Sequence, residues 1–321
     1  MKSLLRLIAC GTLALCASAH AADAYPSRPI RLLVGFPPGG AVDVVARTLG
    51  QALSANVGQP VIIENKPGAS TNIAVKSLID SAPDGYTLML TANSLASNMA
   101  LFTPPPFDAE KDVAPVALVG QVPVVLAAGA GSEYTSLAQL VEAAKARPGT
   151  INYASPGNGS TPHLAVELFA HAAGIRLSHI PYKGGAPAIT DVLGGQLPLV
   201  AVNALEVVPH VKAGKMRVLA SMSAKRSAML PDAPTIAESG YPGFEASVWY
   251  GVIAPAKTPP EVIAKLTAQI RKALDTGEVK SKLTAVGGEV AYGTPQQFAT
   301  LIHSERERYE KVVREAHIKA D

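Results

Sequence analysis

Short apolar runs alternate with helical stretches along most of this chain, and this alternation restricts the possible folds more than any other feature. Nine runs have the length and the aliphatic, β-branched content of buried strands: Ile30–Val34, Val61–Glu64, Thr87–Thr91, Val122–Ala127, Ile151–Ala154, Leu177–Pro181, Leu199–Asn203, Arg217–Ser221 and Tyr250–Ala254. The helical stretches between and after them are Val42–Asn56, Thr71–Ser81, Leu137–Arg147, Pro162–Ala173, Ala186–Leu193, Pro259–Asp275 and Pro295–His317. The pattern predicts an α/β fold with mostly parallel sheets flanked by helices.

The number of predicted strands favours two sheets over one, and no internal repeat indicates a solenoid. The block from 121 to 240 has its own strand–helix units, and the proline- and glycine-rich stretches at 104–106 and 240–243 suit surface connections at its edges. We therefore predict two α/β lobes. Lobe 1 is discontinuous and consists of 22–122 and 245–321, and lobe 2 is 123–244.

Residues 1–21 are typical of a cleavable export signal. A basic start precedes an apolar stretch at 7–17, and Ala19-His20-Ala21 supplies the small-x-small cleavage pattern. The apolar stretch is shorter than the roughly 20 residues that cross a bilayer. Leu7-Ile8-Ala9-Cys10 resembles a lipobox, so a lipoprotein is the alternative to cleavage after Ala21. Cleavage predicts a periplasmic protein without a membrane anchor.

Composition removes several functional classes. The chain has 28 Lys and Arg against 25 Asp and Glu and is 48% hydrophobic, which argues against a basic nucleic-acid binder and against disorder. Both cysteines, Cys10 and Cys16, lie in the predicted signal, so the exported chain would have no disulfide and no catalytic cysteine. The glycine patterns complete neither a dinucleotide fingerprint, nor a Walker motif, nor a nucleophile elbow. We expect no cofactor and no nucleic-acid partner.

Four glycine-rich loops, each between a predicted strand and a predicted helix, are the candidate ligand-binding segments. They are 35–43, 65–72, 154–163 and 182–187. In α/β sheets such loops meet beyond the carboxyl ends of the strands, and the helix N-termini that follow them attract anions. Their donors are backbone N–H, Ser, Thr and Asn groups with little positive charge, which suits a small carboxylate. For any single loop, ordinary turn chemistry is the alternative.

A metal-enzyme or hydrolase function would depend on few residues. His163, Glu167 and His171 are four residues apart, so they lie along one face of a predicted helix. The spacing is not that of a known zinc helix, and we expect an ordinary amphipathic helix and no metal site. His179 and His210 have no evident partner in the sequence. A hydrolase would otherwise need a serine that no motif identifies.

The last predicted helix carries a run of mixed charges from 305 to 315, which is typical of a solvent-exposed helix face. Apolar residues at helical spacing predict its buried stripe: Ala299, Ile302, Tyr309 and Val313. We expect this helix to be structural.

The loops also carry a resemblance to a known family. The matching motifs, in chain order, are Tyr25-Pro26-x-Arg28-Pro29-Ile30, Phe36-Pro37-Pro38-Gly39-Gly40 with Asp43, Glu64-Asn65-Lys66-Pro67-Gly68-Ala69, Pro83-Asp84-Gly85-Tyr86, Gly157-x-Gly159-Ser160-x-x-His163, Tyr182-Lys183-Gly184-Gly185, Leu230-Pro231-Asp232-Ala233-Pro234-Thr235 and Trp249-Tyr250-Gly251. With these motifs the chain resembles the Bug (TctC-like) receptors of tripartite tricarboxylate transporters. The resemblance implies a two-lobed periplasmic-binding-protein fold (Venus flytrap, type II). It further implies a monomer without catalysis that captures a small organic acid, a di- or tricarboxylate or a related carboxylate, and delivers it to membrane permease subunits.

The resemblance also implies a set of ligand-binding residues. From lobe 1 these are Phe36, Pro38, Gly39, Gly40, Ala69 and Ser70, with Asn93 next to Ser94 after the third strand. From lobe 2 they are Ser155, Asn158, Gly159, Ser160 and Thr161, with Asn203 at the rim. Asp43 and Arg47 are expected to form a structural pair near the first loop. An exported α/β hydrolase or metal enzyme, and an orphan sensor that presents its ligand to a signalling partner, are the alternative functions.

Overall fold

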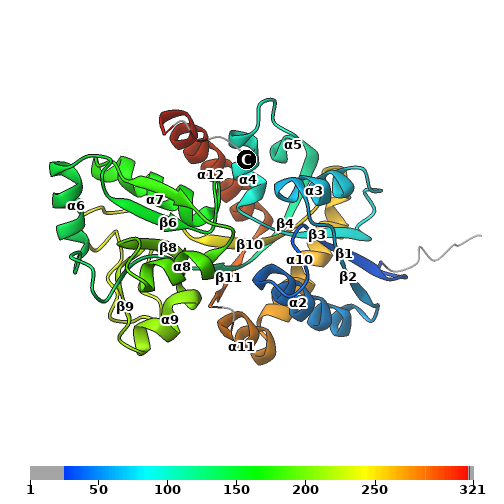
Figure 1. Cartoon of the computed structure of the whole chain (residues 1–321). Coiled ribbons are helices and arrows are strands. Elements are labelled where there is room, and N and C mark those ends of the chain that lie inside the picture. Colours follow the sequence, from blue (N-terminus) through cyan, green and yellow to red (C-terminus); the bar gives the residue numbers. More distant parts are fainter. Residues whose placement is uncertain (1–24, 286, 317, 319–321) are drawn as a thin grey trace, which may run out of the picture.

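The computed structural model describes residues 25–285, 287–316 and 318, so the predicted signal peptide, 1–21, lies outside the described residues. The described residues form two α/β lobes side by side (Figure 1). Each lobe has one sheet with helices on both faces. The prediction of a two-lobed α/β fold is confirmed. None of the described helices is long and apolar enough to cross a membrane.

Lobe 1 contains a six-stranded sheet with the strand order β11-β4-β10-β3-β1-β2. Its strands are β1 (Ile30–Val34), β2 (Val61–Asn65), β3 (Thr87–Ala92), β4 (Val113–Val122), β10 (Val248–Pro255) and β11 (Glu289–Gly293). β1 pairs in parallel with β2 and β3, which places Leu32 opposite Ile63 and Leu88. β10 lies antiparallel between β3 and β4. The sheet is thus built from two separate stretches of the chain.

Alternating side chains of β1 divide the core of lobe 1 into two layers. Leu32 packs on the face covered by α2 (Ala41–Val57), α10 (Pro260–Leu274) and α11 (Gly277–Ala285). Leu33 packs on the opposite face, which is covered by α3 (Asn72–Ile79), α4 (Ser94–Leu101), α5 (Ala109–Asp112) and α12 (Pro295–Glu315). A short 3-10 helix, η2 (Ala69–Thr71), precedes α3. Both faces are buried, which explains the continuous apolar runs of these strands.

Lobe 2 repeats this layered plan with a five-stranded sheet of order β7-β6-β8-β5-β9. Its strands are β5 (Val124–Gly129), β6 (Asn152–Ser155), β7 (Ser178–Pro181), β8 (Leu199–Asn203) and β9 (Met216–Ser221). Leu126 faces α6 (Leu137–Ala146) and α7 (Thr161–Ala173). Val125 faces α8 (Gly185–Leu193) and α9 (Ala204–Lys212).

The sheets contain antiparallel pairs that the sequence did not predict, although most strands within each sheet run in one direction. In lobe 1, β10 is antiparallel to β3 and β4, and β11 is antiparallel to β4. In lobe 2, β5 is antiparallel to β8 and β9. β5 and β10 are the strands that the chain enters when it passes from one lobe to the other. Each joins its new sheet against the direction of its neighbours, and no local sequence pattern reveals that direction.

The passage between lobes also changes one predicted strand. The run predicted at Val122–Ala127 is two strands, because β4 ends at Val122 and β5 begins at Val124 in the other sheet. Pro123, which cannot donate a ladder hydrogen bond, stands between them. The chain returns to lobe 1 between β9 and β10. These positions support the predicted boundaries at 122/123 and 244/245, which we retain as proposed domain limits.

Helix α12 has most of the predicted apolar stripe, with Ile302, Tyr309 and Val313 buried. Its charged run is not a fully solvated face, and this corrects the expectation. Glu305 is only 4% exposed and accepts hydrogen bonds from the Tyr309 hydroxyl at 2.6 Å and from Asn93 Nδ2 at 3.1 Å. A buried carboxylate needs such partners, so this residue belongs to the packing of lobe 1.

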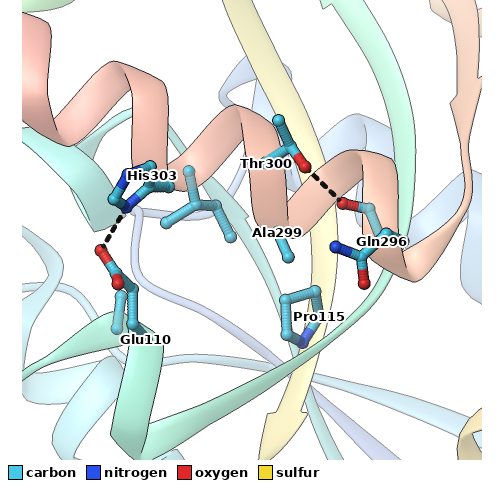
Figure 2. Close-up of a pocket in the computed structure, with 8 residues that line it drawn as sticks. Glu110, Pro115, Gln296, Ala299, Thr300 and His303 are labelled. Carbon is cyan, nitrogen blue, oxygen red and sulfur yellow. Dashed lines mark hydrogen bonds and ion pairs between the residues drawn. The ribbon is translucent and has the colours of Figure 1, made fainter.

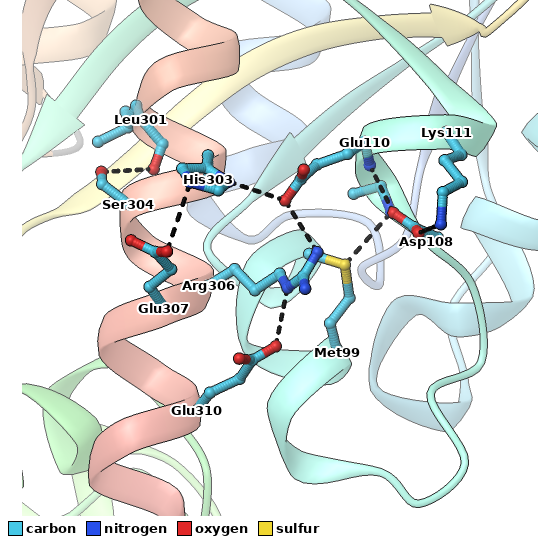
Figure 3. A network of polar contacts seen from close by, with 11 residues as sticks. Met99, Asp108, Glu110, Lys111, Leu301, His303, Ser304, Arg306, Glu307 and Glu310 are labelled. Atoms are coloured by element: carbon cyan, nitrogen blue, oxygen red, sulfur yellow. Dashed lines mark hydrogen bonds and ion pairs between the residues drawn. The ribbon is translucent and has the colours of Figure 1, made fainter.

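Other charges of α12 tie it to α5, as Figure 3 shows. Arg306 donates to Glu110 at 2.9 Å and to Glu310 at 2.8 Å, and Glu110 also contacts His303 at 3.1 Å. The hydrogen bond with Glu110 and the charges of Glu307 and Glu110 raise the pKa of His303. The network fixes the back of lobe 1 and is separate from the predicted ligand loops.

Candidate ligand-binding site

A cavity of about 620 Å³ lies between the lobes, where the loops that follow strands of both sheets meet. Lobe 1 contributes parts of 36–42, 70–71 and 92–102, together with Val248 and Tyr250 of β10. Lobe 2 contributes 156–162, Gly185, Asn203 and Glu206. The volume lies in the range of pockets that bind small organic molecules.

Most of the predicted ligand-binding residues come together at this cavity. Those that line it are Phe36, Pro38, Gly40, Ser70, Asn158, Gly159, Ser160, Thr161 and Asn203. Four others are outside the lining: Gly39, Ala69, Asn93 and Ser155. Residues from all four predicted glycine-rich loops thus meet at one cavity. The contact of each residue with a ligand stays a prediction.

Five helices begin at the cavity wall: α2, α4, α7, α8 and α9. The first residues of the first four, Ala41, Ser94, Thr161 and Gly185, line the cavity, and so does Asn203, which precedes α9. The first N–H groups of a helix have no partner within it, and the helix dipole makes that end partially positive. No described residue that lines the cavity is Lys, Arg or His. The site can therefore attract an anion through helix ends and hydrogen bonds without a cationic side chain.

Asp43 holds the first loop of lobe 1. It accepts hydrogen bonds from Gly39 N–H, Asn65 Nδ2 and Arg47 Nε, each at 2.9 Å. Gly39 has a φ of +86°, a conformation that favours glycine. Burial alone would raise the pKa of Asp43, but the hydrogen bonds from Arg47, Gly39 and Asn65 outweigh it and lower the pKa to about 2. The predicted pair of Asp43 and Arg47 exists, and it fixes the loop beside the cavity.

The second loop of lobe 1 has a strained backbone. Ala69, Ser70 and Thr71 have φ values of 45°, 52° and 77°, so three consecutive non-glycine residues are in the left-handed region. Asn98 of α4 donates from Nδ2 to the Ser70 carbonyl at 2.7 Å, and the Thr71 hydroxyl donates to Ser94 Oγ at 3.1 Å. Such conformations cost about 1–3 kcal/mol each and persist only where the surroundings hold them. Helix α4 supplies that support at the cavity wall.

His163 holds the corresponding loop of lobe 2. Gly159, with a φ of +68°, donates its N–H to His163 Nδ1 at 3.0 Å. The Ser160 hydroxyl donates to the Gly157 carbonyl at 2.7 Å and caps the first turn of α7. Burial and the neighbouring His179 lower the pKa of His163 to about 3. The ring is therefore neutral at ordinary pH and Nδ1 can accept the glycine hydrogen bond.

Ser155 and His179 lie behind this loop. Ser155 Oγ and His179 Nε2 are 2.6 Å apart, and the His179 ring stacks on His163 with centroids 3.7 Å apart. Ser155 is fully buried and also bonds the Gly157 carbonyl at 3.1 Å. This serine–histidine pair supports the loop from within lobe 2, so its position gives no support to the hydrolase alternative.

Asn93 is also used for packing. Its Nδ2 donates to the Ser247 carbonyl at 3.0 Å and to Glu305, and its Oδ1 accepts a hydrogen bond from the backbone N–H of Trp249 at 2.9 Å. These bonds join the end of β3 to β10 and α12. The next residue, Ser94, is the one that lines the cavity.

The three residues of the metal alternative have separate partners. His163 accepts from Gly159, and Glu167 accepts from the Tyr153 hydroxyl at 2.7 Å. His171 Nδ1 lies 3.0 Å from Glu315 of α12. In the part of the chain that the structure describes, no three His, Cys, Asp or Glu side chains are grouped as a metal site.

Several lining residues were missed by sequence reasoning. Ser97 and Asn98 lie on α4, which was not among the predicted helices, and Glu206 and Tyr250 come from α9 and β10. One signal was available for α4, because positions 94, 97 and 98 have the spacing of a polar helix face. Glu206 follows Asn203 by three residues, which is the spacing of a helix cap and not of a pocket motif.

A second, smaller hollow of about 330 Å³ lies within lobe 1, between α5, β4 and α12 (Figure 2). Glu110 and His303 stand at one side of it and Pro115 and Gln296 at the other. None of the predicted ligand-binding residues lines it. This hollow offers a comparison site for binding experiments.

The sequence and fold match a known receptor family. A model described as "Tripartite tricarboxylate transporter family receptor" matches residues 45–318. Protein BugT of Bordetella pertussis (strain Tohama I) is 41% identical over 300 residues, which cover 93% of this chain and 92% of BugT. A TctC solute binding protein from Polaromonas has a TM-score of 0.81 at 30% identity, with 91% of this chain and 99% of that chain covered. An R. palustris protein solved with adipate has a TM-score of 0.76 at 34% identity, with 92% and 99% covered. This chain therefore belongs to the periplasmic solute-binding receptors of the tripartite tricarboxylate transporter family.

Proposed function

We propose that this chain captures a small organic acid in the cavity between its lobes and delivers it to the membrane permease of a tripartite tricarboxylate-type transporter. The observation that carries this proposal is the meeting of five helix N-termini from both lobes around one cavity that has no cationic side chain among its described lining residues. Such a site binds a carboxylate through backbone N–H and hydroxyl groups. The adipate bound by the R. palustris relative is an acid of this class.

Closure of the two lobes on the ligand is part of the proposal. Gly159 of lobe 2 lies so close to lobe 1 that a Cβ atom placed on it would be 2.9 Å from Leu101 Cδ1. The lobes are joined at Pro123 and again before β10, and few backbone positions are needed for a hinge between lobes. A ligand that bonds to the loops of both lobes would stabilise the arrangement in which Gly159 lies close to Leu101.

The biological setting is proposed from the same residues. A signal peptide cleaved after Ala21 would export the chain to the periplasm, where it acts as a monomer without catalysis, cofactor or metal. The support is the membership of a receptor family and the involvement of Ser155, His163 and His179 in loop packing.

Titration calorimetry tests the binding function. The purified protein is unfolded to remove any bound compound, refolded, and titrated with a panel of mono-, di- and tricarboxylates and amino acids. We expect at least one acid to bind and to raise the unfolding temperature, because ligand that binds only the folded state stabilises it. A refolded protein that none of these acids stabilises contradicts the proposal.

Two substitutions locate the binding site in the same experiment. Asn98→Ala removes support from the strained loop at the cavity and is expected to weaken binding. His303→Ala lies at the second hollow and is expected to leave binding unchanged. Weaker binding in His303→Ala with unchanged binding in Asn98→Ala would place the binding site at the second hollow, within lobe 1.

A further inference from the structure

Glu206 is the one charged residue among the described residues that line the cavity. It lies in the first turn of α9, directly after β8 of lobe 2. Its Oε1 accepts hydrogen bonds from the Asn203 N–H at 3.2 Å and from Asn203 Nδ2 at 3.1 Å. The carboxylate thus supplies the anion that the N-terminus of α9 favours, and this helix end is already occupied by the protein's own charge.

The second oxygen of Glu206 has no hydrogen-bond donor among the described residues. Oε2 lies 1.8 Å from the point where a Cβ atom on Gly185 would stand, so it fills the space beside the first residue of α8. Gly185 and Glu206 both line the cavity. The Glu206 carboxylate therefore faces the start of α8 as well as that of α9, while the helix ends of α2, α4 and α7 have no such acid in the lining.

Tyr250 is a second observation that points to a polar ligand group on the Glu206 side of the cavity. It is 2% exposed and lines the cavity from β10 of lobe 1. Its hydroxyl makes no hydrogen bond with another described residue, so it can bond a polar group of a ligand in the cavity. Burial and the negative charge of Glu206 raise the pKa of Tyr250, so the two groups are within electrostatic reach across the cleft.

We propose that Glu206, with Tyr250 opposite, selects a ligand that has a carboxylate at one end and an ammonium group at the other. This inference rests on the proposed acid-binding function and names its ligand class. The carboxylate would bind at the helix ends of α2, α4 and α7, and the ammonium would donate to Glu206 Oε2 and the Tyr250 hydroxyl. A second carboxylate at this end would meet the charge of Glu206 with no cationic side chain to offset it.

The burial of Glu206 supports this choice of ligand. Burial raises the pKa of the Glu206 carboxyl more than its hydrogen bonds from Asn203 lower it. Partial burial thus disfavours the ionised carboxylate to some extent, and an opposite charge beside Oε2 would offset this effect. A ligand ammonium supplies that charge, and a hydrogen bond between two charged groups is stronger than one between neutral groups.

Matched pairs of linear acids test the proposal. In each pair, one terminal group changes from carboxylate to ammonium at equal chain length: succinate and 4-aminobutanoate, glutarate and 5-aminopentanoate, adipate and 6-aminohexanoate. Calorimetric titration of the refolded full chain gives the affinity ratio within each pair. In the pair whose length fits the cavity, we expect the amino acid to bind at least about tenfold more tightly than the diacid.

Glu206→Gln is the decisive variant, because glutamine keeps an oxygen for the Asn203 hydrogen bonds while it removes the charge. We expect it to weaken amino-acid binding about tenfold or more and to leave diacid binding equal or stronger, so that the preference disappears. Tyr250→Phe keeps the ring in the core and is expected to weaken amino-acid binding about fivefold. It provides a second test if Glu206→Gln does not fold, which the unfolding temperature of the free variant reveals.

The outcomes separate the two proposals. If diacids bind more tightly than amino acids and Glu206→Gln leaves the ratio unchanged, the acid-binding function stands and the role of Glu206 is wrong. If no carboxylate of either kind binds the wild-type chain, both proposals fail. An unchanged ratio in Tyr250→Phe together with a lost preference in Glu206→Gln would remove Tyr250 from the site and keep Glu206.

Discussion

The two lobes hold their ligand loops by the same geometry with different chemistry. In lobe 1 the N–H of Gly39 donates to Asp43, and in lobe 2 the N–H of Gly159 donates to His163. In both, a glycine with positive φ bonds a side chain four residues later, in the first turn of the next helix. The comparison shows that the loop shape needs an acceptor at this position, whether it is an anion or a neutral ring.

The two loops differ in how many hydrogen bonds their acceptor side chain receives. Asp43 binds three donors and is ionised, whereas His163 accepts one glycine hydrogen bond and is neutral. They also differ across the cleft. A Cβ atom on Gly159 would approach Leu101 of lobe 1, whereas a Cβ atom on Gly39 would have no neighbour within 4 Å. The loop of lobe 2 is therefore the one whose shape limits closure.

The largest expected effect comes from exchanging the two acceptors for asparagine. Asp43→Asn turns one acceptor oxygen into a donor that faces the donors of Gly39, Asn65 or Arg47, and we expect a loss of about 2–3 kcal/mol of unfolding free energy. His163→Asn keeps an acceptor near Nδ1 and should cost about 1 kcal/mol. Urea unfolding of both variants checks the difference. Equal losses of unfolding free energy in the two variants would show that Asp43 and His163 contribute equally to stability.

The His163 loop of lobe 2 and the Asp43 loop of lobe 1 should affect stability in different pH ranges. The pKa of His163 is lowered to about 3, below its ordinary value of 6.5, so only the unfolded chain gains a proton between these values. Stability is complete above pH 6.5 and is lost as pH falls, by about 2 kcal/mol at pH 5. The lowered pKa of Asp43 acts only below its ordinary value of 3.8, towards about 2.

The control for this prediction is His163→Asn, whose stability should change less between pH 7 and 5. The variant keeps His179, which stacks on His163, and Glu167 of α7 with its hydrogen bond from the Tyr153 hydroxyl of β6. A wild-type chain whose stability is the same at pH 7 and pH 5 would contradict a neutral, buried His163.

A third prediction concerns closure. Gly159→Ala and Gly39→Ala both place a side chain at positive φ, but only the first also meets Leu101 across the cleft. We expect Gly159→Ala to weaken ligand binding about tenfold more than Gly39→Ala. Adding Leu101→Ala to Gly159→Ala should restore part of the affinity, since it removes the contact. No recovery in the double variant would mean that the lobes do not approach at this point when ligand binds.

The smallest expected effect tests the strained loop of lobe 1. Asn98→Ala removes the hydrogen bond to the Ser70 carbonyl, and we expect about fivefold weaker binding, because the left-handed segment 69–71 would no longer be held. Ser160→Ala, the cap of α7, is the counterpart in lobe 2. Because the Ser160 hydroxyl already bonds the Gly157 carbonyl and the His163 N–H, its loss should act mainly on stability, by about 1 kcal/mol. Calorimetry and unfolding curves of both variants check the contrast. A larger loss of affinity in Ser160→Ala would reverse it.

Much of the fold was predictable because strands covered on both faces leave a strong apolar signal. The runs at Ile30–Val34 and Leu199–Asn203 are strands with those bounds. The direction of β5 and β10 was not predictable, since it depends on how the chain passes between lobes. Helix α4, residues 94–101, was missed because it is short and mostly buried, so the polar positions 94, 97 and 98 leave only a weak amphipathic pattern.

The loops of the candidate site could be predicted from the sequence, but the residues that pack behind those loops could not. Glycine-rich segments identify where backbone N–H groups can approach a ligand, and the residues at 36–40 and 158–161 mostly line the cavity. Asn93 and Ser155 look like ligand donors in sequence, but their partners, Trp249 and His179, are distant in the chain. Tertiary contacts of this kind leave no local pattern.

A crystal structure of the refolded protein with the tightest-binding acid of the panel tests the central claim most directly. The account predicts the ligand in the cavity between the lobes, with its carboxylate within hydrogen-bond distance of backbone N–H or hydroxyl groups from both 70–71 and 158–161. A ligand in the hollow between α5 and α12, or one bound by a single lobe, would contradict it.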